Sequence, residues 1–203
     1  MPAKRRAKSP PKPASQRLID ATLSLAESQG WRRLDMAAIA AAADVPLDEA
    51  HSLYRSKYAV LSAFRHSIDE AVLAGGLVTG DDPRDRLFDV LMRRLEALQP
   101  YRASLRIILR ESVGDPALIR SVPGLMRSMS WMLGAAGLPS GGCRGHLSCR
   151  ALAALYVSVL PTFYRDESTD LGTTMVALDR RLRQVESMLG FLKPVFSGVK
   201  STS

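Results

Sequence analysis

Residues 17–57 decide the fold: RLIDATLSLAESQGWRRLDMAAIAAAADVPLDEAHSLYRSK. Apolar residues recur at steps of three and four up to Gly30, which predicts a helix that ends at that glycine. Asp35 suits the N-cap of a second helix, and Pro46 suits the first position of a third. The alanines between them let neighbouring helices approach closely. The stretch therefore predicts three short helices separated by two breaks.

The rest of the chain continues in helical patterns. Amphipathic helices are expected over 57–73, 84–98, 146–164 and 169–190, with two more between Pro100 and the loop at 137–145, where Pro123 is expected to split or kink the second. No strand pattern or internal repeat is visible. The sequence predicts an all-α protein of about nine helices, in which a small N-terminal three-helix domain precedes a larger C-terminal bundle.

Basic charge is concentrated at the N-terminus. The net charge is +8, and the first 14 residues carry five cations and no acid: Lys4, Arg5, Arg6, Lys8 and Lys12. This proline-rich segment cannot bury a core and is expected to be a disordered arm. A basic arm on a compact body can follow a polyphosphate backbone, and it can equally be a solubilising tail.

Several protein classes do not fit the sequence. The basic start leads into prolines rather than an apolar core, so no secretory signal is expected. The longest apolar run, 151–164, is shorter than the roughly 20 residues that span a bilayer. Cys143 and Cys149 would face opposite sides of a helix, which disfavours a disulfide or a shared metal. We expect a cytoplasmic protein with reduced thiols.

Enzymatic patterns are also missing. The three histidines lie on separate predicted helices, and no glycine-rich phosphate loop, metal-spaced cluster or nucleophile elbow occurs. We therefore expect no catalysis, no metal and no cofactor.

The N-terminal third resembles the helix-turn-helix domain of TetR-family transcriptional regulators. The matching features follow in order: the apolar pattern of 18–25, Gly30-Trp31, Ile39-Ala40, Val45, and Tyr54 with Ser56-Lys57. The resemblance implies a homodimer that binds a palindromic double-stranded operator and responds to a small apolar ligand. It also implies a division of the chain into an arm (1–14), a DNA-binding domain (15–60), a ligand-binding and dimerisation domain (61–190) and a flexible tail (191–203).

The resemblance assigns the DNA contacts as well. The third helix lies in the major groove of DNA in that family, which would direct Leu47, His51 and Ser52 towards the bases. Lys57, at the start of the fourth helix, would contact phosphate beside backbone N–H groups. Tyr54 is expected to pack that helix on the core, with its hydroxyl within reach of phosphate, and Arg5 and Arg6 of the arm would follow the backbone of the DNA.

The resemblance implies two further sets of residues. The middle helices should enclose a ligand pocket, to which methionines and an indole are suited: Met92, Ile108, Met126, Met129 and Trp131. The Met-rich helix could instead be ordinary core. The last two long helices should pair with those of a second copy in a four-helix bundle through Leu155, Leu171, Met175, Leu178 and Leu182.

The third helix leaves an alternative open. Its residues Asp48 and Glu49 are acidic, and such acids repel a polyanion, although Glu49 could accept a hydrogen bond from a cytosine amine. Residues 164–182, and more faintly 94–101, resemble a second family with this fold, which binds lipids or isoprenoids and supports ubiquinone biosynthesis. That resemblance implies an accessory protein that does not read DNA. A capped, salt-bridged dimer helix would also explain 164–182.

Overall fold

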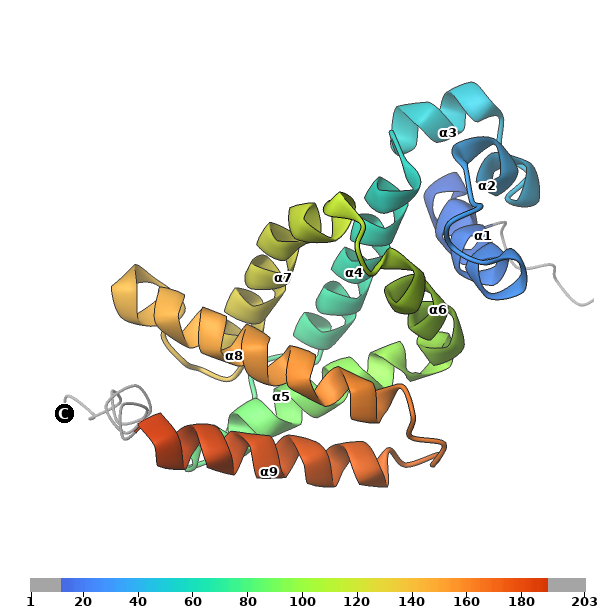
Figure 1. Cartoon of the computed structure of the whole chain (residues 1–203). Coiled ribbons are helices and arrows are strands. Elements are labelled where there is room, and N and C mark those ends of the chain that lie inside the picture. Colours follow the sequence, from blue (N-terminus) through green and yellow to red (C-terminus); the bar gives the residue numbers. More distant parts are fainter. Residues whose placement is uncertain (1–11, 190–203) are drawn as a thin grey trace, which may run out of the picture.

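The computed structural model describes residues 12–189, and the regular secondary structure in this part of the chain is all helical, as predicted (Figure 1). A 3-10 turn, Gln99–Tyr101, separates the fifth and sixth helices. The α-helices are α1 (Ala14–Gln29), α2 (Met36–Ala42), α3 (Leu47–Leu53), α4 (Lys57–Ala74), α5 (Pro83–Leu98), α6 (Arg102–Ser112), α7 (Pro116–Ala135), α8 (Gly142–Phe163) and α9 (Gly172–Leu189). The predicted arm contacts of Arg5 and Arg6 and the predicted tail at 191–203 lie outside the described residues.

Helices α1 to α3 form the small N-terminal unit. The Asp35 carboxylate accepts a hydrogen bond from Ala38 N at 2.8 Å, which confirms the predicted cap of α2. At the turn before α3, Asp44 has φ 51°, and Arg17 Nη1 donates to the carbonyls of Ala43 and Asp44 at 3.0 and 2.8 Å. A guanidinium at the carboxyl end of α2 neutralises the partial negative charge of its free carbonyls. The turn is thus fixed from α1.

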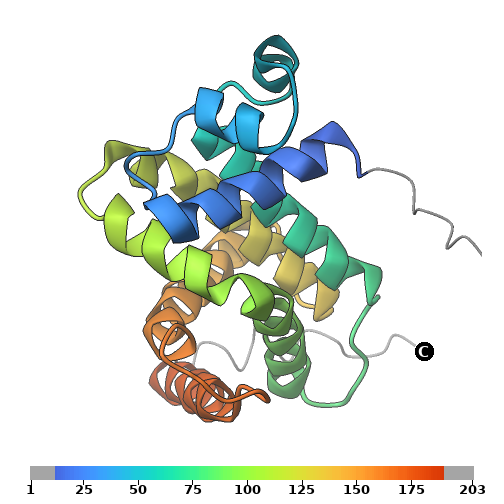
Figure 2. The ribbon, with the colours of Figure 1, turned by 90° about the vertical axis from the view of Figure 1, so that its right-hand side faces the viewer.

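Helix α4 connects this unit to the larger bundle. Its N-cap Ser56 accepts from Ala59 N at 3.3 Å, and one face buries Val60, Phe64 and Ile68. Figure 2 shows α1 lying across α4 and α6. Because α4 runs unbroken from Lys57 to Ala74, the predicted boundary at 60/61 falls within a continuous helix.

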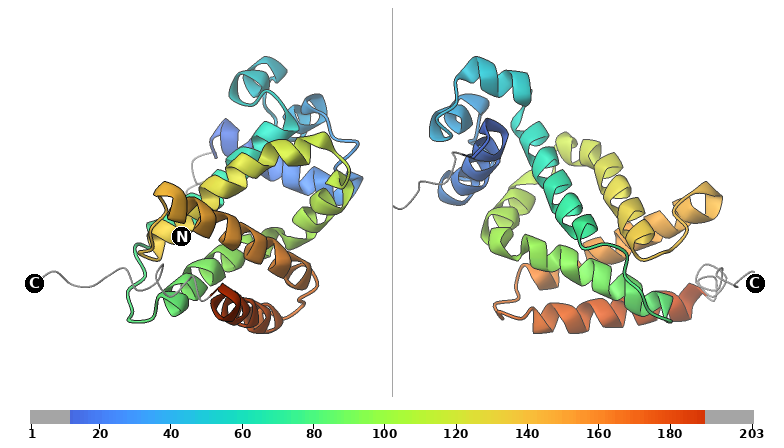
Figure 3. Two further views of the ribbon diagram at one scale, coloured as in Figure 1. Left: turned by 60° about the vertical axis from the view of Figure 1, so that its left-hand side comes forward. Right: turned by 180° about the vertical axis from the view of Figure 1, so that it is seen from behind.

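The larger unit consists of α5 to α9 packed around the lower part of α4. Helices α8 and α9 lie side by side, and α9 also covers α5 (Figure 3). Pro123 does not split α7, which is a single helix over Pro116–Ala135. Within residues 12–189, none of the helices combines the length and the apolar character needed to cross a bilayer.

The reversal between α8 and α9 is held by one carboxylate. Asp166 is 4% exposed and accepts from the backbone N–H and the hydroxyl of Thr174 at 2.7 and 2.6 Å, and from Ser168 N at 3.1 Å. Burial alone would raise the pKa of Asp166, but the hydrogen bonds from Ser168 and Thr174 prevail and lower it to about 2. The acidic start of the 164–182 stretch therefore caps a helix.

The structure corrects the predicted dimer contacts. Four of the five residues are buried inside their own chain and cannot form a surface for a second copy: Leu155, Leu171, Leu178 and Leu182. Their apolar stripe packs α9 onto α8 and α5. Met175 alone of the five is exposed, and the outer faces of α8 and α9 also expose Val157 and Val176.

Candidate nucleic-acid interface

Helix α3 stands at one end of the molecule and exposes almost all of its residues (Figure 1). Ala50 is its one buried residue and seats it on the helices below. Leu47 is 45% exposed, and His51 and Ser52 are exposed as well, as the resemblance implied. The Ser52 hydroxyl donates to Glu49 O at 2.8 Å, so its oxygen can still accept a hydrogen bond from a base. Of these three residues predicted to face the bases, Leu47 is apolar, and His51 and Ser52 are polar.

Charge on this surface is mixed. Asp48 and Glu49 are exposed in the first turn of α3, where they suit the positive end of the helix dipole but oppose an approaching phosphate. Two cations that the sequence analysis did not single out flank the helix-turn-helix, Arg33 before α2 and Arg55 after α3, and both are exposed. Their place in the short breaks beside the predicted helices was the signal that could have identified them.

Lys57 lies where the resemblance placed it, but its side chain turns inward. The ammonium donates to Trp31 O at 2.8 Å and to Leu34 O at 2.9 Å, and lies 4.8 Å from the centre of the Trp31 ring. Burial lowers the pKa of Lys57, while the carboxylates of Asp115, Asp35 and Glu111 oppose the shift. The phosphate contact stays a prediction, and the ammonium would have to leave these carbonyls to make it.

Tyr54 ends α3 in an extended conformation and is half-buried against the core. Its backbone N–H donates to Ala50 O at 2.8 Å, and burial raises the pKa of its hydroxyl. The packing role expected for this residue is confirmed.

The helix-turn-helix is fastened to the start of α7 and the end of α6. The Tyr58 hydroxyl donates to the carboxylate of Asp115, the N-cap of α7, and this bond lowers the pKa of Asp115. Glu111 Oε2 accepts from Arg32 N at 2.9 Å, and Arg32 Nε donates to Glu111 O at 2.9 Å. These contacts cross from the loop before α2 and the start of α4 to the larger bundle, so a movement of α6 or α7 would be passed directly to the helix-turn-helix.

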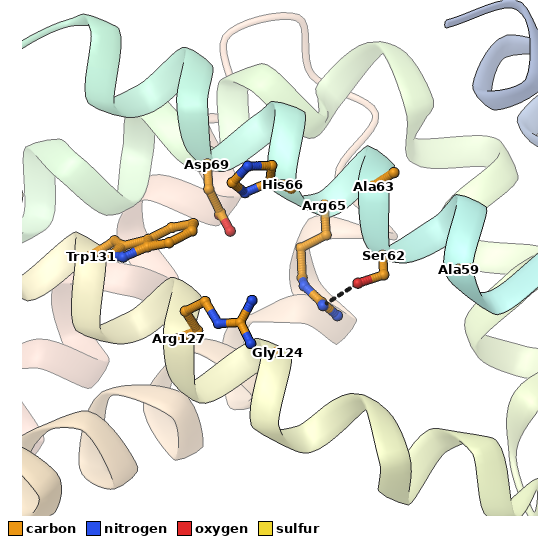
Figure 4. A pocket seen from close by; sticks show the side chains of 9 residues that line it. All are labelled: Ala59, Ser62, Ala63, Arg65, His66, Asp69, Gly124, Arg127 and Trp131. Carbon is orange, nitrogen blue, oxygen red and sulfur yellow. Dashed lines mark hydrogen bonds between the residues drawn. The ribbon is translucent and has the colours of Figure 1, made fainter. Parts of the chain in front are cut away.

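A pocket of about 410 Å³ lies between α4 and α7 (Figure 4). Charged and polar side chains line much of it, together with small residues and one indole: Ala59, Ser62, Ala63, Arg65, His66, Asp69, Gly124, Arg127 and Trp131. Of the predicted ligand residues, only Trp131 belongs to this lining. Met92, Ile108 and Met129 are buried core residues and Met126 is half-buried against them, so the structure does not bring the predicted set together.

Behind the pocket the bundle buries an ion pair. Arg94 of α5 donates through Nε to Asp69 Oδ1 of α4 at 3.1 Å, and both side chains are at most 4% exposed. Arg94 also donates to the Tyr156 hydroxyl of α8, and the Ser128 hydroxyl of α7 donates to Asp69 Oδ2. One network thus joins four helices at the centre of the larger unit.

Comparison with known proteins identifies the fold. No protein-family model and no curated protein sequence matches the chain significantly. Among solved structures, a TetR transcriptional regulator from Nitrosomonas europaea is similar at 24% identity with a TM-score of 0.70, covering 87% of this chain and 99% of that one. A TetR transcriptional regulator from Rhodococcus sp. RHA1 is similar at 21% identity and a TM-score of 0.64, covering 87% and 97%.

A third neighbour is the SmeT–triclosan complex, similar at 18% identity with a TM-score of 0.57 over 84% of this chain and 90% of that one. Each of these three matches covers at least 84% of this chain. The chain therefore has the fold of the TetR-family transcriptional regulators.

Proposed function

We propose that this protein is a homodimeric, DNA-binding transcriptional regulator of the ligand-responsive repressor type. The observation that carries the proposal is helix α3, which is seated through Ala50 and presents Leu47, His51 and Ser52 outward at one end of the molecule. A helix anchored on one side and open on the other is what insertion into a major groove requires.

The contacts divide into two kinds. Leu47 can touch a thymine methyl group, and His51 and Ser52 can exchange hydrogen bonds with base edges. Phosphate contacts fall to the exposed Arg33 and Arg55 and to the basic residues of the N-terminal arm, since cations position a protein on DNA without reading its sequence. Two copies of α3 would lie about 34–36 Å apart on a palindromic operator.

The outer faces of α8 and α9 are the proposed dimer surface. Val157, Met175 and Val176 are large apolar side chains that no residue of their own chain covers fully. Pairing of these two helices with their symmetry mates would bury them in a four-helix bundle.

Ligand response is supported by the fastening of the helix-turn-helix. Tyr58 and Lys57 at the start of α4, together with Glu111 of α6, hold the loop before α2 and the start of α7. A ligand that separates α4 from α7 would shift these anchors and change the spacing of the two α3 helices. The solved complex of SmeT with triclosan supports a small-molecule role for this fold.

The test is fluorescence anisotropy with DNA fragments tiled from the region upstream of the protein's own gene, at roughly 50 and 200 mM salt. We expect selective, saturable binding at the higher salt concentration. His51→Ala should weaken operator binding by about 5- to 150-fold, since a base contact contributes roughly 1–3 kcal/mol, and should leave binding to unrelated DNA unchanged. Gln29→Ala, at an exposed position of α1 outside α3 and outside the proposed dimer surface, is the control.

A second function is favoured by one observation, the exposed pair Asp48 and Glu49 on α3. These carboxylates disfavour a polyanion and fit a lipid- or isoprenoid-binding accessory protein of ubiquinone biosynthesis. Weak binding that ignores sequence and disappears at 200 mM salt, with lipid found by mass spectrometry in the purified protein, would replace the regulator proposal with this one.

A further inference from the structure

The pocket between α4 and α7 carries an excess of positive charge. Arg65 of α4 and Arg127 of α7 approach from opposite walls and direct their guanidinium groups towards the space between the helices (Figure 4). In the part of the chain that the structure describes, neither guanidinium forms a salt bridge with a carboxylate. Arg65 Nη2 donates to the uncharged Ser62 hydroxyl at 2.9 Å.

The one carboxylate in the lining is already engaged. Asp69 accepts from Arg94 through Oδ1 and from Ser128 through Oδ2, so its charge is matched by the buried guanidinium behind it. Burial lowers the pKa of Arg65; Asp69 opposes that shift, and the cations Arg94 and Arg127 add to it. Burial and the neighbouring cations therefore disfavour the charge of Arg65, and an anion bound beside it would stabilise that charge.

Helix α7 is shaped to admit this guanidinium. A Cβ atom at Gly124 would lie 2.0 Å from Arg65 Nη2, so any other residue at this position would push the Arg65 side chain away. The absence of a side chain at Gly124 thus makes space for the Arg65 guanidinium, although glycine lowers the helix propensity at this position.

An indole, an imidazole and small side chains form most of the remaining lining. The Trp131 indole lies at the end of the pocket beside the His66 ring, with ring centres 5.4 Å apart, and the small side chains of Ala59 and Ala63 line α4. A volume of about 410 Å³ is within the usual range for small-molecule sites.

We propose that this pocket binds a small organic carboxylate with a flat apolar body, whose carboxylate lies between Arg65 and Arg127 and whose body lies against Trp131. Guanidinium groups bind carboxylates through paired, charge-assisted hydrogen bonds, and an indole face suits an aromatic ring. The assignment adds a carboxylate to the small, mainly apolar ligand expected from the sequence. Its role as the effector rests on the proposed function, but the binding itself does not.

The experiment is isothermal titration calorimetry on the full chain without DNA. The probes are 2-naphthoate, its uncharged analogue 2-naphthamide and inorganic phosphate. We expect 2-naphthoate to bind at least ~10-fold more tightly than 2-naphthamide, because only the carboxylate engages the two guanidinium groups. Phosphate should bind more weakly than 2-naphthoate, because it has no body to place against Trp131.

Two variants locate the site. Arg127→Gln removes an exposed cation without disturbing the core and should weaken 2-naphthoate binding at least ~10-fold. Gly124→Ala keeps both arginines but displaces Arg65, and should weaken binding in the same direction while preserving the fold. Arg120→Gln, an exposed arginine of α7 outside the lining, is the matched control and should leave the affinity unchanged.

The outcomes separate the two proposals. Equal affinity for 2-naphthoate and 2-naphthamide, absence of 2-naphthoate binding, or equal loss in the Arg120→Gln control would overturn the carboxylate site, whatever the protein does with DNA. Tighter binding of phosphate would identify an anion site without the aromatic subsite and would also overturn the proposal as stated. Selective 2-naphthoate binding by a protein that shows no operator preference would support the site and reject the proposed regulator.

Discussion

Two cations, the half-buried Lys57 and the buried Arg94, lie in regions of the molecule that differ in how easily their contacts can open. Lys57, under the helix-turn-helix, is held by the backbone carbonyls of Trp31 and Leu34 and by the face of an aromatic ring. Arg94, in the larger bundle, is 3% exposed and is held by the Asp69 carboxylate and the Tyr156 hydroxyl.

The difference lies in what remains when each contact is broken. The carbonyls around Lys57 belong to a loop near the surface, so water can replace the ammonium. Loss of Arg94 would leave the Asp69 carboxylate in the core with no counter-charge, which is far more costly. The joint between the two units can therefore open at a modest cost, while the centre of the bundle resists change.

Arg94→Met should have the largest effect, and it tests whether the centre of the bundle is as rigid as the comparison requires. We expect the free energy of unfolding to fall by about 3–5 kcal/mol, because a buried charge loses its partner. Urea denaturation measures this change in the free energy of unfolding. The control is Arg106→Met, on the exposed surface of α6. A loss below ~1 kcal/mol would show that Asp69 is compensated elsewhere and that the network is not the fixed centre.

Lys57→Met should have a smaller and local effect. We expect the free energy that holds the loop on the start of α4 to fall by about 1–2 kcal/mol, because the hydrogen bonds to Trp31 O and Leu34 O are lost. Amide hydrogen exchange should quicken in the loop at 31–34 and stay unchanged in α5 and α8. Equal acceleration throughout the protein would mean that the loop and the bundle unfold as one unit, and the proposed division would be lost.

Tyr58→Phe should give the smallest effect, and that effect should depend on pH. The Tyr58 hydroxyl is the main cause of the lowered pKa of Asp115. A carboxylate whose pKa is lowered by folding stabilises the fold above its unfolded pKa of about 3.9, and that contribution disappears as the pH falls through the folded value. The variant should therefore differ from the native chain at pH 6 and converge with it at lower pH, as followed by urea midpoints. A difference that persists unchanged at low pH would assign the effect to packing of the ring.

The sequence predicted the fold well because the signals are local. Periodic apolar residues, the Asp35 cap and Gly30 act within one or two helical turns, and the structure places helices where they indicate. The exposure of Leu47, His51 and Ser52 was predictable for a similar reason: a helix of two turns that is seated through one small residue, Ala50, leaves most of its surface open.

The predictions that failed depend on contacts between distant segments. Leu178 and Leu182 repeat at helical spacing, but the spacing does not say whether the stripe faces a second copy or the chain's own α8 and α5. The phosphate contact of Lys57 stays a prediction, but no local signal indicated the carbonyl partners of its ammonium, which lie more than 20 residues away in the chain. Likewise, nothing local pairs Arg65 with Arg127, because their pocket arises only when α7 packs on α4.

The unbroken helix α4 also acts as a lever. Its 18 residues span about 27 Å, with the pocket along its middle and the helix-turn-helix unit attached at its first turn. A tilt of about 5° about one end displaces the other by about 2 Å for a rod of that length. Hydrogen bonds to base edges tolerate much less than that. In the proposed dimeric regulator, a tilt of this size would be enough to decide whether both copies of α3 fit their operator.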